Sequence, residues 1–534
     1  MALSCRYPEE DIDFLIYLLA VIICKRKEYP MTRLNPEKNK KSKELSRRKF
    51  LGTVSAATAG FTIIPRHVMP GKGYQQPSDT VNVAGIGIGA RGAANLRGLC
   101  DPDVPIVNPQ RTSTGQPLSK EEIAAREARM TNRPQGGAPQ GGAPQGGQQT
   151  REPVKLANIY ALCDVDTDFA AHIFKGYPKA KVYTDWRQLL EKEKSIDAVM
   201  IGTPDHSHAP IAAAFMRQKK HIYVEKPMCK TIFECRKLAE IAKEYNVVTQ
   251  MGNQGHASEG ARLINEWIQS GAIGLVREVN LSTNRPIWPQ GNITRPAGID
   301  IPKSLNWDVW LGPAPKKDYH PDICHFNWRG LRDYGTGALG DMGAHIYDHA
   351  FWSLNLGIPT RVQASSSVYN NEFWPLAEMI TYEFPARGYM PPVTITWVDG
   401  GLRAPRPIEI DPGTRVNSAL YIGDKGVLMH GDYGSNPQLL PKKVMDQFVP
   451  PKPWLPRSPG IYAEWIDAIK NNTKSSTDFS YASRLVETMM LGNIAVLMAS
   501  KNMTLEYDPD KMEFTNLPEA NELLHYKYRE GWTL

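Results

Sequence analysis

The feature that most constrains this fold is a glycine-rich turn that joins an apolar run to a helical pattern near residue 90. Residues 81–88 (VNVAGIGI) are apolar and β-branched, which predicts a strand, and residues 93–99 (AANLRGL) predict a helix. Between them Gly87, Gly89 and Gly92 form the pattern Gly-x-Gly-x-x-Gly, although Gly85 offers a competing register. In such a turn a pyrophosphate can approach the backbone at the helix N-terminus. The segment therefore predicts a dinucleotide-binding site.

Short apolar runs and helical patterns then alternate up to about residue 252. The expected strands are 157–163, 181–183, 196–201, 221–224 and 247–251. The expected helices are 169–174, 186–193, 211–218 and 232–245. This alternation predicts a doubly wound parallel sheet of the Rossmann type over residues 79–252. Ligands of such sheets bind at the carboxyl ends of the strands, where this sequence has Gly87, Asp164, Thr203 and Glu225–Lys226–Pro227.

After about residue 253, extended segments dominate and are separated by loops rich in aromatic residues and proline. These segments are 276–283, 361–368, 379–384, 394–398 and 419–422, and amphipathic helical patterns follow at 462–471 and 483–499. The pattern predicts an α+β domain over residues 253–534, built on a large open, mostly antiparallel sheet that covers the cleft. The expected fold class is therefore α/β, with the Rossmann domain first.

An insertion at about residues 101–152 interrupts the first domain. It contains a repeat of Pro, Gln, Gly and Ala from 134 to 147, which cannot bury a core and predicts a disordered loop. Without the insertion, Asp164 follows the second strand at the spacing expected for an acidic residue that accepts hydrogen bonds from the adenosine ribose. A carboxylate there repels a 2′-phosphate, which favours NAD. Arg91 could receive a phosphate and leaves NADP open.

Residues 1–78 are interpreted as an N-terminal extension that carries an export signal. The sequence Ser46–Gly52 (SRRKFLG) precedes a weakly apolar run up to Ile64, which predicts twin-arginine export and a periplasmic location. The apolar run 14–24 has eleven residues, too few to span a bilayer. Because no lipobox cysteine follows the signal, a stable membrane anchor is not expected. A true start at Met31 is a further hypothesis.

Charge and cysteine content argue against two other classes of protein. The formal net charge of +7 lies in residues 1–78, which hold 14 basic and 7 acidic residues, and the rest of the chain is balanced. A nucleic-acid partner is therefore not expected. The cysteines lack metal-ligand spacing, with Cys229 and Cys235 six residues apart, and are expected to be small core residues. No bound metal is predicted.

Three downstream residues supply the chemistry for removing a hydride from a hydroxyl-bearing carbon. Lys226 stands before a proline at the end of a buried strand, where it can polarise a sugar hydroxyl or relay its proton. Asp341 and His345 are four residues apart and share a face if the segment is helical. His345 can then take the hydroxyl proton, and Asp341 can orient and stabilise its imidazole. The simpler alternatives are a Lys226–Glu225 pair and a helix-surface contact.

Other residues near these motifs are candidates for binding. Cofactor contacts are expected from Gly87, Gly89, Arg91, Gly92, Asp164, Thr203, Pro204, His208, Glu225 and Lys226. Substrate contacts are expected from Asn253, His256, Trp328, Arg329 and Tyr334. Trp307, Trp310 and Trp374 could also stack on a sugar, although each is more simply a core residue. His349 and Asp348 could extend the spacing of His345 into a metal face, but hydride chemistry on NAD needs no metal.

Taken together, these motifs resemble those of a known enzyme family. The glycine turn, Cys163–Asp166 (CDVD), Thr203–His208 (TPDHSH), Glu225–Pro227 (EKP) and Gly340–His345 (GDMGAH) occur in family order. Apart from the insertion, residues 80–534 resemble the glucose-fructose oxidoreductase, inositol dehydrogenase and rhizopine-catabolism oxidoreductase (Gfo/Idh/MocA) family. The closing residues 528–532 resemble exported members from Bacteroidetes-type bacteria. Asp205 stands where the family often has Asn, which puts a nicotinamide contact there in doubt.

The resemblance implies an NAD(P)-dependent oxidoreductase acting on a sugar, polyol or glycoside hydroxyl, and a homo-oligomer formed through the open sheet. The periplasm is not expected to hold free dinucleotide, so the cofactor should be held tightly and restored in place, by a second carbonyl substrate or a redox-neutral cycle. One alternative is a redox-neutral NAD-dependent glycosidase, like the α-N-acetylgalactosaminidase branch of the family, which works by oxidation and elimination. Another is a non-catalytic sugar-binding protein, against which the intact Lys226, Asp341 and His345 argue.

Overall fold

The computed structural model describes residues 80–106, 153–408 and 410–534. The twin-arginine segment and the Pro/Gln/Gly/Ala repeat lie outside these residues, so the expectations about export and about the insertion are not addressed by the structure. Every described residue belongs to one unit, Pro70–Leu534. The boundary predicted at residues 252 and 253 lies inside this unit and stays a prediction.

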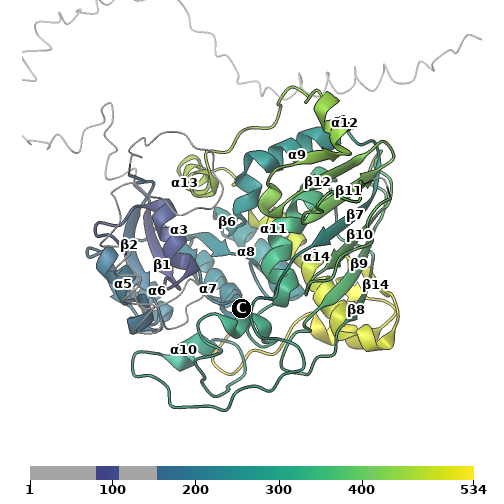
Figure 1. The fold of residues 1–534 in the computed structure, drawn as a ribbon. Helices are drawn as coiled ribbons and strands as arrows, with labels where there is room; N and C mark the ends of the chain where they lie inside the picture. The colour runs from purple at the N-terminus through teal and green to yellow at the C-terminus, as the bar shows by residue number, and fades with distance from the viewer. Residues whose placement is uncertain (1–79, 107–152, 409) are drawn as a thin grey trace, which may run out of the picture. The chain divides into compact units, whose positions relative to one another are not determined.

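A parallel sheet forms the N-terminal part of the described chain, with strand order β3-β2-β1-β4-β5-β6 (Figure 1). Its strands are β1 (Asn82–Ile86), β2 (Asn158–Cys163), β3 (Lys181–Tyr183), β4 (Ala198–Ile201), β5 (His221–Glu225) and β6 (Thr249–Gly252). The central strands are buried on both faces because helices cover the sheet on both sides. The predicted Rossmann-type sheet is confirmed.

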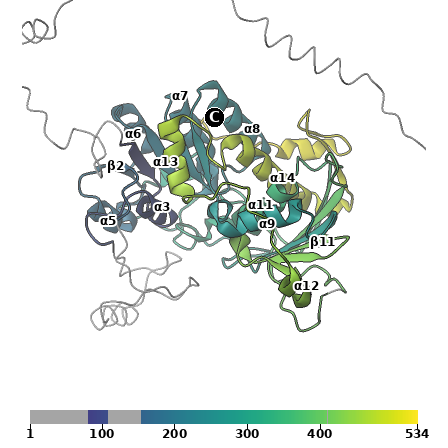
Figure 2. The same cartoon turned by 90° about the horizontal axis from the view of Figure 1, so that it is seen from above.

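Helices on the two faces of the parallel sheet come from different parts of the chain (Figure 2). One face packs against α3 (Arg91–Leu99), α5 (Thr167–Gly176) and α13 (Ile461–Asn471). The other packs against α6 (Trp186–Lys192), α7 (Asp205–Arg217) and α8 (Ile232–Glu244). α13 is far away in sequence, yet its Tyr462 hydroxyl donates to Asn95 Oδ1 at 2.8 Å and its Trp465 packs edge-on against Tyr223.

Side-chain caps explain where several of these helices begin. The predicted start of α7 was wrong. The Asp166 side chain accepts from the first N–H groups of α5, and Thr231 with Glu234 forms a capping box at α8. Helix α7 was expected to begin at residue 211 but begins at Asp205. Pro210 lies inside it and removes just one backbone hydrogen bond, which the buried packing of α7 outweighs.

The second sheet is mostly antiparallel, as predicted. Its strand order is β13-β12-β11-β7-β10-β9-β8-β14-β15, with β7 and β10 as a parallel pair. Its strands are β7 (Val276–Ser282), β8 (Arg361–Ser366), β9 (Glu378–Phe384), β10 (Val393–Val398), β11 (Ala419–Gly423), β12 (Val427–His430), β13 (Gln438–Leu440), β14 (Leu505–Asp508) and β15 (Glu513–Phe514). The helices α9 (Glu259–Gln269), α11 (Gly337–Ser353) and α14 (Phe479–Leu497) fill the space between the two sheets (Figure 1). α14 packs directly on α8 of the first sheet.

Short helices occur mainly in the loops of the second half. They are α10 (Trp307–Leu311), α12 (Lys442–Gln447) and the 3-10 helices η3 (Gln254–Ala257), η4 (Asn327–Gly330), η5 (Asp432–Gly434), η6 (Ala499–Lys501) and η7 (Pro518–Leu523). None of the helices in the described ranges is both long and apolar enough to cross a bilayer.

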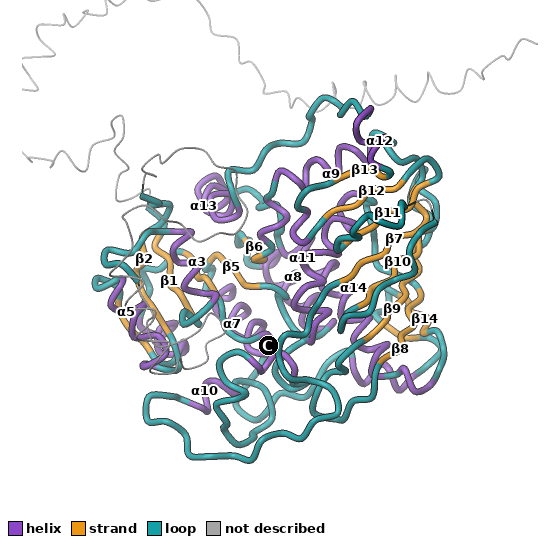
Figure 3. The backbone as a smooth tube through the Cα atoms, viewed as in Figure 1, coloured by secondary structure: helices purple, strands orange, loops and turns teal. Residues whose placement is uncertain are grey.

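A long connection, residues 283–336, leaves β7 and reaches α11 by way of α10 (Figure 3). We call it the crossing loop, because it contacts the turn after β2 on its way. Asn306 N donates to Val165 O at 2.8 Å, and Thr167 N donates to Ser304 O at 3.1 Å. The crossing loop therefore lies against the same end of the parallel sheet at which ligands are expected.

Candidate active site

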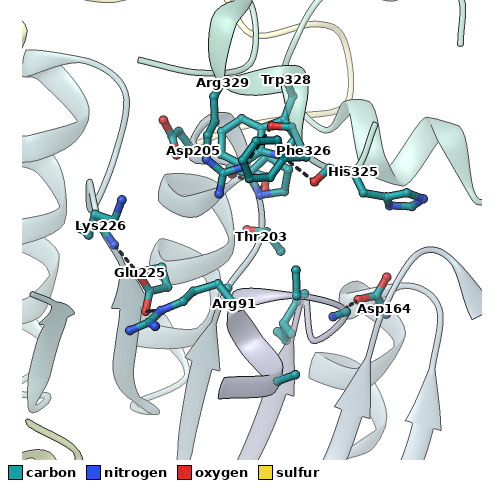
Figure 4. Close-up of a pocket in the computed structure, with 18 of the residues that line it drawn as sticks. Arg91, Asp164, Thr203, Asp205, Glu225, Lys226, His325, Phe326, Trp328 and Arg329 are labelled. Carbon is teal, nitrogen blue, oxygen red and sulfur yellow. Dashed lines mark hydrogen bonds and ion pairs between the residues drawn. The ribbon is translucent and has the colours of Figure 1, made fainter. Parts of the chain in front are cut away.

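A cavity of about 810 Å³ runs along the carboxyl ends of β1, β2, β4 and β5, and the crossing loop and α11 form its opposite wall (Figure 4). Most of the predicted site residues line it. These are Gly87, Gly89, Arg91, Asp164, Thr203, Pro204, Glu225, Lys226, Trp328, Arg329, Asp341 and His345. The structure thus brings the glycine turn, the lysine and the aspartate–histidine motif to one space.

The glycine turn has the geometry of a phosphate-binding loop. Gly87 has φ of +72°, and a Cβ there would lie 2.6 Å from the backbone nitrogen of Thr203. Gly92 does not line the cavity, because it packs against the turn itself, where a Cβ would meet the Gly87 carbonyl at 2.1 Å. The N-terminus of α3 has no side-chain cap and no acidic residue in its first turn. Its N–H groups are therefore suited to a dinucleotide pyrophosphate.

Asp164 lies at the end of β2 beside this turn. Its Oδ2 accepts from the N–H groups of Ile88 at 2.8 Å and Gly89 at 3.0 Å, and its Oδ1 accepts from Asp166 N at 3.1 Å. Burial raises the pKa of Asp164 above its ordinary value, although these N–H groups oppose the rise. The carboxylate therefore first fixes the turn, and because Asp164 also lines the cavity, a ribose hydroxyl could donate to its remaining lone pairs.

The crossing loop closes over this end with an aromatic ring pair. His325 stacks on Phe169 with 3.9 Å between ring centroids, and its Nε2 lies 3.1 Å from Asp166 Oδ2. Burial would raise the pKa of Asp166, but hydrogen bonds from His325 and from Phe169 N lower it to about 2. The side chains of His325 and Phe169 were not predicted, because nothing in the local sequence indicates that they meet.

The Lys226 side chain makes its contacts with helix α11. Its Nζ donates to the backbone oxygen of Asp341 at 2.7 Å and to Asp341 Oδ1 at 2.8 Å. Arg329 Nε lies 3.5 Å from Oδ1 of the same carboxylate, and Arg285 Nε lies 4.0 Å from Oδ2. Burial would raise the pKa of Asp341, but the charges of Lys226 and Arg329 outweigh it and hold that pKa well below its ordinary range.

The Glu225 side chain accepts from the backbone N–H of Lys226 at 3.4 Å, but Lys226 Nζ turns to Asp341, so the alternative of a Lys226–Glu225 side-chain pair is wrong. Glu225 Oε1 accepts from Arg91 Nε at 3.1 Å, from Asn95 Nδ2 at 2.9 Å and from Gln254 Nε2 at 3.2 Å. Arg91 is therefore already paired, which weakens the case for a 2′-phosphate contact there.

His345 is oriented by Asn253 and not by Asp341. His345 Nδ1 lies 2.9 Å from Asn253 Oδ1, while the Asp341 carboxylate turns to Lys226. Because an amide oxygen can only accept, Nδ1 carries the proton and Nε2 remains an acceptor. Burial and the charge of Lys226 lower the pKa of His345 well below its ordinary value. His345 is therefore a neutral base in the cavity wall, with the Tyr433 ring 4.4 Å away.

Besides Gly92, four predicted binding residues lie outside the cavity lining. Asn253 is fully buried behind His345, and the buried His256 pairs with Asp348 at 2.9 Å. Tyr334 is buried among the rings of His206 and Trp310. The side chains of Asn253 and His256 are buried where β6 leads into η3, and Tyr334 is buried where the crossing loop packs on α7 and α10, so none of the three lines the cavity and their role as substrate contacts stays a prediction.

The fourth, His208, was expected to contact the cofactor. Its ring nitrogens lie 2.8 Å from Pro227 O and 2.8 Å from Thr203 O. It therefore supports the two loops that carry Lys226 and Thr203 from behind.

Asp205, the departure from the family pattern, faces a different partner from the one expected. Its Oδ2 accepts from Thr336 N at 3.1 Å and from Thr336 Oγ1 at 2.6 Å. It therefore joins the start of α7 to the start of α11, although it also borders the cavity. No group of three or more potential ligands in the described ranges is placed to hold a metal ion.

Arg285, Phe326, Gln254 and Tyr433 line the cavity but were not predicted. Arg285 could have been suggested by its sequence, because it precedes a proline as Lys226 does. The other three are placed by tertiary structure and carry no local signal.

Two family models match the chain. A model described as an oxidoreductase family with an NAD-binding Rossmann fold matches residues 137–253. A model described as the C-terminal alpha/beta domain of an oxidoreductase family matches residues 262–385. Both matches agree with the order of the two sheets.

Curated relatives align over parts of their length. The levoglucosan dehydrogenase of Pseudarthrobacter phenanthrenivorans is 25% identical over 189 residues, which is 35% of this chain and 40% of that protein. Glycosyl hydrolase family 109 protein 1 of Shewanella sp. (strain ANA-3) is 34% identical over 124 residues, which is 21% of this chain and 27% of that protein. The chain thus matches less than half the length of either relative.

Among solved structures, the WlbA dehydrogenase from Bordetella pertussis, in complex with NADH and UDP-GlcNAcA, has a TM-score of 0.50 at 13% identity. The superposition covers 80% of this chain and 99% of that chain. At this identity the likeness concerns the fold alone.

Proposed function

Because the chain belongs to the Gfo/Idh/MocA family of oxidoreductases, we propose that it oxidises a hydroxyl group of a sugar, polyol or glycoside in an NAD-dependent reaction. NAD bound along the parallel sheet supplies the acceptor for the hydride. One observation carries the proposal: the uncapped N-terminus of α3, Lys226 and His345 all open into one cavity. The binding of a dinucleotide and of an alcohol beside it requires such a shared space.

The two ends of the cavity would hold different parts of the ligands. The N–H groups of α3 and the carboxylate of Asp164 would hold the pyrophosphate and the adenosine ribose. Lys226 and His345 lie further along the strand ends, where the reactive carbon of the substrate would lie. Asp341, on α11, positions Lys226, and Asn253 positions His345 from behind.

Lys226 and His345 have complementary parts in moving the hydroxyl proton. The ammonium of Lys226, fixed by Asp341, would donate to the substrate oxygen and stabilise the charge that develops there. Nε2 of His345 would accept the proton, since Nδ1–H is held by Asn253. Closure of the crossing loop would exclude water from this end of the cavity.

The cofactor is proposed to stay bound through the catalytic cycle. The support is the set of contacts between the crossing loop and the turn after β2, including His325 with Asp166. In a periplasmic protein a bound cofactor would be restored by a second carbonyl substrate or by a redox-neutral cycle. Export rests on the arginine pair at Arg47–Arg48, outside the described residues. A homo-oligomer is proposed through the face of the second sheet that points away from α11 and α14.

The test begins by releasing and identifying the small molecules bound to the purified protein. The NAD-loaded protein is then mixed with a panel of sugars, polyols and glycosides while the absorbance of reduced nicotinamide is followed. Lys226→Ala and His345→Ala are each expected to slow the reduction by about 10²- to 10⁴-fold without loss of bound NAD. The control is Lys237→Ala, a partly exposed lysine on α8. Reduction at the wild-type rate in Lys226→Ala would rule out the proposed mechanism.

A second candidate is a redox-neutral glycosidase, favoured by the 34% identity to the glycosyl hydrolase family 109 protein. In that reaction transient oxidation would acidify a neighbouring C–H bond, and elimination would break the glycosidic bond. Water would then add to the resulting double bond, and return of the hydride would reduce the ketone. Release of aglycone without net formation of reduced cofactor would identify this activity. Net reduction with an intact glycoside would identify the dehydrogenase.

A further inference from the structure

The end of the cavity that holds Lys226 carries more positive than negative side chains. Lys226, Arg285 and Arg329 surround one carboxylate, Asp341. Their side chains are 14%, 27% and 22% exposed, so solvent screens them less than it screens surface charges. Among the described residues, the Asp341 carboxylate hydrogen-bonds to Lys226 but to neither arginine, since both arginines lie beyond hydrogen-bond distance of it.

Neighbouring carboxylates do not neutralise these arginines. Glu225 is engaged by Arg91, Asn95 and Gln254. Asp205 also lies at this end, and its Oδ2 is held by Thr336. With Glu225 set against its partner Arg91, the three cations Lys226, Arg285 and Arg329 exceed the two carboxylates Asp341 and Asp205 by one.

Both guanidinium groups keep free donors. Arg329 donates Nη1 to Phe326 O at 3.0 Å, and Arg285 donates Nη1 to Asn284 Oδ1 at 2.7 Å. Within the described ranges no hydrogen bond engages Nη2 of either residue. Arg329 is also fixed in direction, because it lies 4.3 Å from the Trp328 ring and 4.7 Å from the Phe326 ring. A guanidinium held in this way presents a planar fork suited to an oxyanion.

The pyrophosphate of the cofactor has a separate place. It would lie at the N-terminus of α3, whereas both arginines lie around Asp341, the partner of Lys226. The oxidised nicotinamide ring is itself cationic and adds to the excess of positive charge. The free donors are therefore directed at the second ligand.

We propose that the hydroxyl substrate is an anionic sugar, whose carboxylate or other oxyanion binds between Arg285 and Arg329 while its reacting hydroxyl meets Lys226. This assignment rests on the proposed function for the position of the reacting carbon. The aromatic faces of Trp328 and Phe326 would lie beside the sugar ring. A carboxylate fits the two planar forks best, and sulfate or phosphate esters share the same chemistry.

The test compares matched sugars on the NAD-loaded full-length protein. Glucose and galactose are set against glucuronate and galacturonate, with glucose 6-phosphate and glucose 6-sulfate to distinguish the oxyanions. Binding is measured by calorimetry and, separately, reduction of the cofactor is followed. At least one anionic sugar is expected to bind about 10- to 100-fold more tightly than its neutral parent, with the ratio falling as salt is added. No preference for any anionic sugar overturns the proposal.

Variants assign the preference to the two arginines. Arg285→Gln and Arg329→Gln are each expected to lower the ratio of anionic to neutral affinity by about 5-fold or more. Arg285→Lys and Arg329→Lys keep the charge but lose the fork, and should give intermediate ratios if the glutamine variants fold poorly. Arg332→Gln, three residues along the crossing loop and outside the cavity lining, is the control. A preference that survives in the double glutamine variant contradicts the proposal.

The two proposals can fail separately. Arginine-dependent binding of an anionic sugar without reduction of NAD would support the anion site and count against the oxidoreductase. Reduction of NAD by neutral sugars alone, at a rate that depends on Lys226, would support the oxidoreductase and count against the anion site.

Discussion

Each end of the cleft holds an aspartate that is largely shielded from solvent, and the two residues are stabilised in opposite ways. Asp164 accepts from three backbone N–H groups at 2.8 to 3.1 Å. Asp341 lies among Lys226, Arg329 and Arg285 at 2.8 to 4.0 Å. The pKa of Asp164 is raised and the pKa of Asp341 is lowered. Peptide dipoles fix a position but carry no net charge, whereas cations set a charge balance that an arriving ligand can change.

The comparison therefore separates two kinds of recognition within one cavity. The cofactor end depends on backbone geometry, so it tolerates few changes of shape. The substrate end depends on side-chain charge, so its affinity can be changed by substitution, salt and pH. Four experiments can break or sharpen this distinction.

The largest effect is expected from Asp341→Asn. Removing the carboxylate charge leaves three neighbouring cations without their counter-charge and weakens the bond that orients Lys226. We expect the free energy of unfolding to fall by ~3 kcal/mol, as for other broken buried ion pairs. The rate of cofactor reduction should fall about 10²- to 10³-fold. Denaturant unfolding and single-turnover absorbance measure the two effects, and a variant with wild-type values for both would show that the charge balance is unimportant.

Asp164→Asn should have a smaller effect, confined to the cofactor. The amide keeps an acceptor for Ile88 and Gly89 but brings an NH₂ group toward Asp166 N–H. We expect NAD affinity to fall about 10-fold, which corresponds to the loss of one hydrogen bond of ~1.4 kcal/mol. With saturating NAD the rate should stay within a few-fold of wild type. Titration of NADH fluorescence tests this, and a large loss of rate would erase the distinction between the two ends.

The two ends should also respond differently to pH. As pH falls from 7 toward 4, Asp164 takes up its proton before an ordinary aspartate would, because its pKa is raised. Asp341 remains ionised throughout this range, because its pKa is lowered. NADH affinity should therefore decline in this window, and the decline should disappear in Asp164→Asn. Equal pH dependence in the variant and the wild type would assign the effect to another group.

The smallest effect is expected from the ring pair over the cofactor end. His325→Ala removes the contact with Asp166 and the stacking on Phe169. Since a single side-chain hydrogen bond contributes little, NAD dissociation should accelerate by about 3-fold. Stopped-flow displacement of bound NADH measures the rate. His320→Ala, a histidine on the crossing loop near Asp322 but outside the cavity lining, is the control and should leave the rate unchanged.

The cofactor end could be predicted well because its rules are local. Strand alternation, a turn with three glycines and a carboxylate after β2 placed Gly87, Asp164 and Thr203 correctly along one edge of the parallel sheet. The lysine before Pro227 belongs to the same edge. The signal for each of these positions lies in the residues next to it in the sequence.

The opposite wall could be predicted only in part, because it depends on tertiary packing. Helix α11 contains Gly337, Gly340 and Gly343, and glycine is a poor helix former. A Cβ at Gly343 would lie 2.8 Å from Met489 Sδ in α14, so packing requires glycine where local propensity disfavours it. Asn253 was correctly predicted to lie at this edge of the parallel sheet, but its side chain is buried in the core and does not line the cavity. The contact of Lys226 with Asp341 spans 115 residues of sequence and carries no local signal.

Helix α13 and the last residues of the chain have a consequence for biosynthesis. Ile461 and Trp465 complete the apolar layer against α3 and Tyr223, and Trp532 packs near Trp186 at 6.1 Å. The ribosome therefore synthesises every strand of the parallel sheet long before it synthesises Ile461–Asn471, which complete the cover of one face. A chain truncated before Ile461 would leave that face of the dinucleotide-binding half open, although every strand of that half had been translated.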